Sequence, residues 1–189
     1  MLLPVYFSSR RGMMVNDDDK FYLDMDVIIF GCGNILFGDD AFGPTTIDYF
    51  NKKYLLPENA LALNVETSIR SLLFNIVLNE QKPRLIMIVD AIDKGRIPGE
   101  IFEINLEEIP EKKVDDFSMH QMPSSNLLKE LQTECLVPIR ILVSQVEYIP
   151  EEVDQKLSVV MQNAIQPMCE RIIEVLSEYN VTVENKLDN

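Results

Sequence analysis

The chain has 189 residues, enough for one domain with a sizeable core. Its formal net charge of −14 disfavours nucleic acids and anionic membrane surfaces as partners, because both repel an acidic protein. The three cysteines lie far apart without a C-x-x-C motif, which is typical of reduced thiols in a cytosolic protein. No segment approaches the roughly 18 consecutive apolar residues of a membrane-spanning helix. We therefore expect a cytoplasmic protein that binds neither membranes nor nucleic acids.

The chain divides into three parts of unequal length. Residues 1–25 are predicted to be an N-terminal extension without stable structure, because the short apolar start precedes its charges and makes a poor signal peptide. Residues 26–182 are predicted to form a single α/β domain, and we expect it to be a monomer. Residues 183–189 form a polar tail that we expect to fray.

The stretch 26–45, DVIIFGCGNILFGDDAFGPT, predicts a strand, a glycine turn and the start of a helix. Apolar residues 27–30 indicate a buried strand, and Asp39 and Asp40 stand just before an amphipathic run. In open α/β sheets, ligands bind beyond the carboxyl ends of the strands, where this loop lies. The stretch is therefore the first candidate for a functional site.

This loop lacks the features of a nucleotide site. Leu36 stands where G-x-G-x-x-G requires glycine, and no Lys or Arg lies between Asp26 and Thr45. Two carboxylates at a helix start suit the helix dipole, and we expect one to cap the first amides while the other faces a cation. The loop thus favours a metal or polar-peptide site, with a tight turn and a capping Asp as the alternative.

Strands and helices alternate along the rest of the chain. Ser124 or Ser125 is expected to cap one helix, the strand at 101–104 to be antiparallel, and Pro167 to kink or split the last helix. The fold class that follows is a three-layer α/β/α arrangement with a twisted, mostly parallel five-stranded sheet and helices on both faces. The further strands are predicted at 61–65, 85–89 and 139–146, and the helices at 45–54, 69–77, from 124 or 125 to about 131, and 153–179.

Three side chains form a candidate metal site. Asp40 and Asp90 each follow an apolar strand, and His120, the only histidine, lies in a polar loop before a helix. If the first and third strands are neighbours, both carboxylates emerge at the same edge, and two carboxylates with one imidazole suit a transition metal ion. Alternatively, His120 is a hydrogen-bonded loop residue and Asp90 forms a turn. Cys32 could pair with His120 as a nucleophile, but we expect Cys32 to pack inward.

The stretch GCGNILFGDDAFG resembles the signature of the hydrogenase maturation endopeptidases, which cleave the C-terminal tail from the large-subunit precursor of [NiFe]-hydrogenases. IVDAIDKGRIPGEI and SMHQMPSSNLLKEL resemble two further segments of this family in the same order, and the similarity spans residues 27–176. Asp40 stands where the family often carries Glu, and the second strand ends in VETSIRS instead of a glycine-rich stretch. Among the members, the chain most resembles archaeal proteins that process coenzyme F420-reducing or related hydrogenases.

The resemblance implies a hydrogenase maturation protease, an aspartyl- and metal-dependent endopeptidase that acts on the large-subunit precursor. It also implies that Asp40, Asp90 and His120 are both the catalytic residues and the ligands of nickel, which the precursor itself supplies. A precursor without nickel would then escape cleavage. The loops expected to bind the precursor tail carry Gly33, Asn34, Leu36 and Glu66.

Two other functions stay open. A non-catalytic, nickel-checking chaperone of the large subunit is suggested by the shorter Asp40. A nucleotide-binding α/β protein is suggested by the glycine loop alone.

Overall fold

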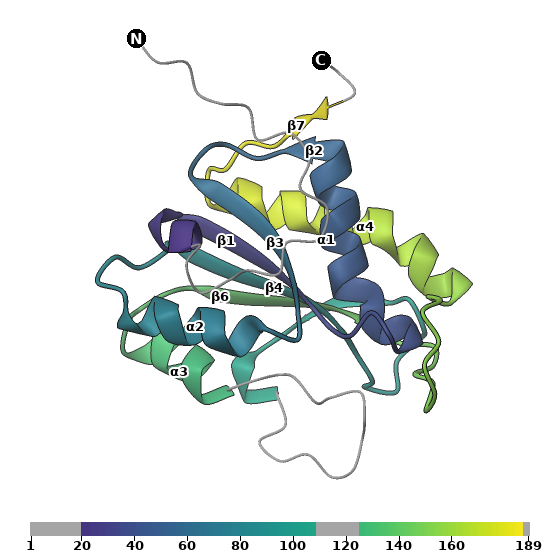
Figure 1. Cartoon of the computed structure of the whole chain (residues 1–189). Helices are drawn as coiled ribbons and strands as arrows, with labels where there is room; N and C mark the ends of the chain where they lie inside the picture. Colours follow the sequence, from purple (N-terminus) through teal and green to yellow (C-terminus); the bar gives the residue numbers. More distant parts are fainter. Residues whose placement is uncertain (1–19, 109–124, 187–189) are drawn as a thin grey trace.

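The computed structural model describes residues 20–108 and 125–186, which contain a five-stranded sheet in the order β3-β1-β4-β6-β5 (Figure 1). Four strands run parallel, and β5 is antiparallel to β6, as predicted. The fold class expected from the sequence is therefore confirmed. The strands are β1 (Val27–Cys32), β3 (Ala60–Glu66), β4 (Leu85–Ile92), β5 (Ile101–Ile104) and β6 (Ile139–Gln145).

Helices cover both faces of the sheet. The helices α1 (Phe42–Lys53) and α4 (Val159–Glu178) pack on one face, and α2 (Ile69–Leu78) and α3 (Ser125–Thr133) on the other (Figure 1). Side chains of β1 alternate between the two cores, and every one of them is buried. A strand covered on both faces in this way requires an unbroken apolar run, which is why β1 was predictable.

The last helix differs from the prediction at its start. It begins at Val159, and Ser158 caps it by accepting a hydrogen bond from the Met161 amide at 3.3 Å. Val153, predicted as the first helical residue, is 65% exposed in the preceding loop. The helix runs through Pro167, so the proline does not split it.

The domain also extends beyond its predicted edges. The 3-10 helix η1 (Lys20–Asp24) places Tyr22 in the core at 1% exposure, and its hydroxyl accepts a hydrogen bond from Asn75. In the predicted tail, β7 (Glu184–Asn185) pairs antiparallel with β2 (Tyr54–Leu55). Residues 1–19 and 187–189 lie outside the described residues.

Glycines bring the start of α1 directly against the strand ends. A Cβ on Gly43 would lie 2.2 Å from the Cys32 carbonyl oxygen and 2.3 Å from that of Val89. A Cβ on Gly31 would lie 2.6 Å from the Gly43 carbonyl oxygen. Because real Cβ atoms do not approach backbone this closely, the helix can reach β1 and β4 only with glycine at these positions.

Asp39 ties two distant loops together. It lies in the 3-10 helix η2 (Gly38–Ala41) and is fully buried. Its carboxylate accepts hydrogen bonds from the amides of Glu147 at 2.9 Å, Tyr148 at 3.1 Å and Ser158 at 2.7 Å, and from the Ser158 hydroxyl at 3.1 Å. The predicted helix cap is wrong, because the cap positions of η2 and α1 are Phe37 and Ala41, without a side-chain hydrogen bond. Asp39 instead holds the loop 147–158 against η2.

Replacing Asp39 by Ala is expected to lower the free energy of unfolding by roughly 3 kcal/mol or more, because three buried amides and a hydroxyl lose their acceptor. Urea denaturation measures the change. The exposed Asp48, which accepts one hydrogen bond from Asn64, supplies the control Asp48→Ala, expected within about 0.5 kcal/mol of the parent. Equal stability of the two variants would show that the Asp39 contacts contribute little.

Candidate functional site

Asp40 and Asp90 come together at the carboxyl edge of the sheet. Asp40 lies in η2, which packs against β4, and β4 carries Asp90; each residue is only 7% exposed. Burial raises the pKa of the Cys32 thiol well above its ordinary value, and the charges of nearby Asp90 and Asp40 raise it further. Both carboxylates therefore lie near the end of β1, as the sequence predicted for neighbouring first and third strands.

The strand that carries Asp90 is longer than predicted. Asp90 was expected just past the strand end, but it lies inside β4, opposite Val143 of β6. The ladder continues to Ile92, opposite Gln145, because β6 offers partners that far. Asp90 is thus held by backbone pairing rather than by a mobile turn.

Backbone amides orient both carboxylates. The Asn34 amide donates a hydrogen bond to Oδ2 of Asp40 at 2.9 Å, and the Ala91 amide donates to Oδ1 of Asp90 at 2.8 Å. Hydrogen bonds to a charged carboxylate are stronger than those to neutral acceptors. The two side chains are therefore fixed in place as a pair of oxygen donors.

Of the four residues predicted to bind substrate, three lie in the loop after β1, namely Gly33, Asn34 and Leu36, and Glu66 is the last residue of β3. The Gly33 amide donates to the Glu66 carbonyl at 3.2 Å, and a Cβ on Gly33 would lie 1.9 Å from the Asp40 carbonyl oxygen. The Asn34 side chain accepts from the Leu36 amide at 3.0 Å, and Leu36 is 38% exposed. Gly33 thus supports the loop through its backbone, and substrate binding by the four residues stays a prediction.

The third predicted ligand, His120, lies outside the described residues. Within residues 20–108 and 125–186, no three His, Cys, Asp or Glu side chains are grouped to hold a metal ion. The Asp39 carboxylate is committed to three amides and a hydroxyl, so the donor of the Asp39–Asp40 doublet is Asp40. Carboxylate oxygens such as those of Asp40 and Asp90 suit a divalent transition metal, and further ligands must come from elsewhere.

The cysteine alternative has little support. Cys32 is 3% exposed, which confirms the predicted inward packing, and its raised pKa disfavours the reactive thiolate. Cys169 is also buried, and burial raises the pKa of its thiol to about 12. Neither thiol has the exposure of a nucleophile.

Sequence reasoning missed a polar residue that shapes the loop after β4. Gln145 is 3% exposed, and its Oε1 accepts hydrogen bonds from the amides of Lys94 at 2.8 Å and Arg96 at 3.1 Å. Its Nε2 donates to Asp93 at 2.9 Å, and this bond, with one from the Gly95 amide, lowers the pKa of Asp93. A glutamine at the end of an apolar strand was the available signal.

Among the described residues, none of the helices combines the length and apolarity needed to cross a bilayer.

Comparison with known proteins gives a consistent result. The family model for hydrogenase maturation proteases matches residues 44–175. A predicted hydrogenase maturation protease of Methanocaldococcus jannaschii is 31% identical over 148 residues, covering 78% of this chain and 94% of the relative. The coenzyme F420 hydrogenase subunit delta of Methanothermobacter thermautotrophicus is 32% identical over 112 residues, covering 57% of this chain and 68% of the relative.

A solved structure supports the same assignment. The hydrogenase maturating endopeptidase HybD of Escherichia coli superposes with a TM-score of 0.69 and 26% identity, covering 87% of this chain and all of the other. The similarity thus extends over most of the chain. The chain belongs to the hydrogenase maturation protease family.

Proposed function

We propose that this protein is an endopeptidase that removes the C-terminal tail of a [NiFe]-hydrogenase large-subunit precursor after nickel insertion. The observation that carries the proposal is the pair of buried carboxylates, Asp40 and Asp90, each held by a backbone amide and both near Cys32 at the carboxyl edge of the sheet. A family member with such a pair can recognise a metal that arrives within its substrate. The coenzyme F420 hydrogenase relative favours a substrate of that hydrogenase type.

Asp40 and Asp90 act as oxygen ligands of the precursor's nickel in this proposal, and His120 supplies an imidazole. Their attraction for a cation is weakly screened because both are nearly excluded from solvent. The Asn34 and Ala91 amides hold the carboxylates ready, so little reorganisation is needed when the precursor docks. When bound, the metal supplies polarisation of the scissile carbonyl or a water of lowered pKa.

The rim of the site offers an apolar surface for the precursor. Ile35 and Leu36 are 39% and 38% exposed, and Tyr148 and Val153 in the neighbouring loop are 41% and 65% exposed. The two loops are joined because the Asp154 amide donates to the Leu36 carbonyl at 3.0 Å. We expect the precursor tail to lie along these loops, with the protein acting as a monomer in the cytoplasm.

A nickel-checking chaperone is the second candidate function. Asp40 is shorter than the Glu that the family often carries, so its carboxylate reaches less far toward a docked metal. A chaperone would form a stable complex with the precursor and leave the large subunit at its original mass.

Nickel-loaded precursor should lose its tail on incubation with the parent protein, whereas Asp40→Asn, Asp90→Asn and His120→Ala should slow cleavage by at least roughly 100-fold. Metal-assisted charge stabilisation contributes several kcal/mol, and about 1.4 kcal/mol is tenfold in rate. Mass spectrometry of the large subunit measures the product. Nickel-free precursor should stay intact.

Asp48→Asn, on the exposed side of α1, is the matched control and should cleave at the parent rate. Equal tail removal by His120→Ala and the parent would end the assignment of the metal ligands. A tight complex without any mass change would establish the chaperone instead.

Thiol reagents should leave the activity unchanged. Iodoacetamide is expected to label Cys135 in the folded protein much faster than Cys32 or Cys169, because Cys135 alone of the three is only half-buried. Peptide mapping identifies the labelled positions, and the processing assay follows activity. Rapid labelling of Cys32 with loss of cleavage would revive the cysteine mechanism.

A further inference from the structure

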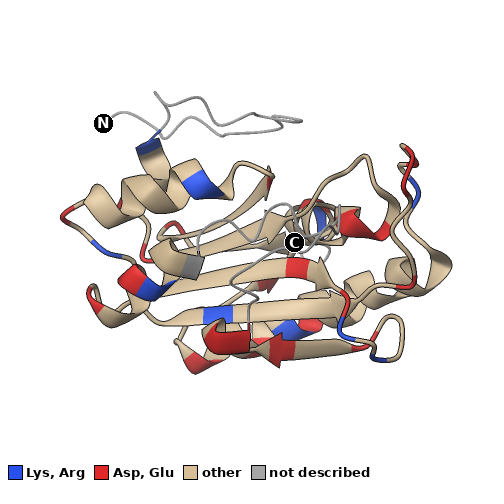
Figure 2. Ribbon diagram, turned by 90° about the horizontal axis from the view of Figure 1, so that it is seen from below, with Lys and Arg blue, Asp and Glu red and all other residues tan. Residues whose placement is uncertain are grey.

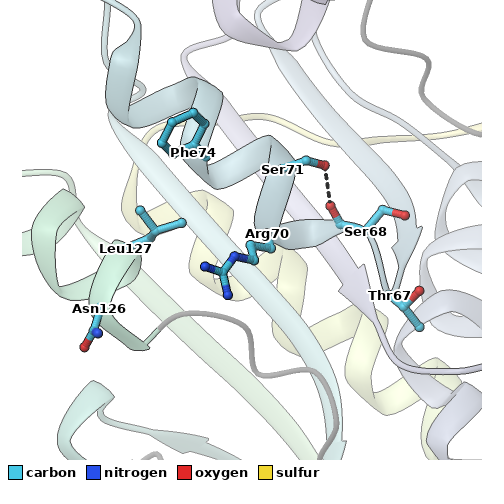
Figure 3. Close-up of a pocket in the computed structure, with 7 residues that line it drawn as sticks. All are labelled: Thr67, Ser68, Arg70, Ser71, Phe74, Asn126 and Leu127. Atoms are coloured by element: carbon cyan, nitrogen blue, oxygen red, sulfur yellow. Dashed lines mark hydrogen bonds between the residues drawn. The ribbon is translucent and has the colours of Figure 1, made fainter.

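A pocket of about 680 Å³ opens between α2 and α3, beside the carboxyl end of β3. Figure 3 shows the Arg70 guanidinium extending from α2 into this space, with the Phe74 ring on the same helix and Leu127 pointing toward it from α3. The pocket therefore combines a cation with an apolar wall. Thr67, Ser68 and Asn126 also line the pocket.

Arg70 differs from the other arginines of the described residues. It makes no ion pair within residues 20–108 and 125–186. Acidic residues outnumber basic ones by 31 to 17 in the whole chain, and Figure 2 shows acidic side chains spread over the described part of the molecule. The remaining arginines each meet a carboxylate: Arg84 with Asp26, Arg96 with Glu100, Arg140 with Glu103 and Glu178, and Arg171 with Glu103 and Glu174. Arg70 thus projects into a pocket where none of the described residues supplies it with a carboxylate, which suits it to a negatively charged ligand.

Neighbouring donors lie around the same space. The Thr67 and Ser68 hydroxyls and the Asn126 side-chain amide donate no hydrogen bond to any described part of the chain. Phe74 is 50% exposed, and with Leu127 it forms the apolar side of the pocket. The lining thus suits a ligand that carries a negative group next to an apolar one.

We propose that this pocket binds a carboxylate of the precursor tail, flanked by an apolar side chain of the same polypeptide; the inference rests on the proposed function. Arginine binds carboxylates through two parallel hydrogen bonds, which distinguishes it from a simple point charge. Thr67 directly follows Glu66, whose carbonyl accepts from the Gly33 amide of the site loop. The pocket is therefore placed to hold the tail while its cleavage point lies at Asp40 and Asp90.

Arg70→Gln should raise KM for nickel-loaded precursor roughly tenfold and leave kcat unchanged, because it removes binding made equally in the ground and transition states. Arg84→Gln is the matched control. Arg84 directly precedes β4 and therefore lies at the amino-terminal edge of the sheet, away from the pocket. Arg84→Gln should change neither KM nor kcat. Arg70→Lys should recover part of the affinity, since it restores the charge without the planar guanidinium.

A synthetic peptide with the tail sequence identifies the carboxylate. It is prepared with a free C-terminus, as the C-terminal amide, and with its Asp and Glu replaced by Asn and Gln. In isothermal titration, one of the two modified peptides should bind the parent protein roughly tenfold more weakly than the unmodified peptide does. The same modification should not change the affinity of the peptide for the Arg70→Gln variant. The modification that does so separates a terminal from a side-chain carboxylate.

Parent KM values in Arg70→Gln, or equal binding of all three peptides, would overturn the inference. A parent protein that cleaves no precursor would refute the proposed function instead. The peptide titration would still test the pocket by itself.

Discussion

The close contact of helix α1 with the ends of β1 and β4 is the constraint on which the site depends. Gly43 meets the carbonyl oxygens of Cys32 and Val89 at distances that no side chain would permit. Because η2 runs directly into α1, this contact also sets the position of Asp40 relative to β4. The glycines of the first loop thus place two carboxylates together rather than opening a cradle for phosphate.

The adjacent residues Asp39 and Asp40 have different physical roles. Asp39 is a buried charge, and such a charge is tolerated only when it is fully hydrogen-bonded. Three amides and a hydroxyl from residues 147–158 meet this requirement, so the carboxylate joins segments more than a hundred residues apart in sequence. The Asp40 carboxylate instead accepts from the Asn34 amide and, like Asp90, lies near Cys32. The rigidity supplied by Asp39 helps to keep Asp40 in place.

The parts of the fold that sequence could predict are those set by local pattern. The apolar runs of β1 and β4 predicted a sheet buried on both faces, and the polar residues after them predicted the edge where Asp40 and Asp90 meet. Contacts between residues far apart in the sequence could not be predicted from local pattern. The hydrogen bonds from Ser158 to Asp39 accompany a loop at residues 153–158, where the apolar spacing predicted helix, so α4 starts later than expected. The position of His120 relative to the two carboxylates stays a prediction.

The end of β3 shows how this chain forms its turn with VETSIRS in place of the glycine-rich stretch that many family members have there. Glu66 has φ of 46°, in the left-handed region that glycine occupies most easily. A residue with a side chain adopts this conformation at a cost of roughly 1–2 kcal/mol, so surrounding contacts must hold it there. The Gly33 amide supplies one by bonding the Glu66 carbonyl, and the Ser68 amide supplies another nearby by bonding the Val65 carbonyl at 2.8 Å. The conformation of the turn is therefore set by neighbouring hydrogen bonds rather than by glycine. The residues that follow it, Thr67, Ser68, Arg70 and Ser71, line the adjoining pocket.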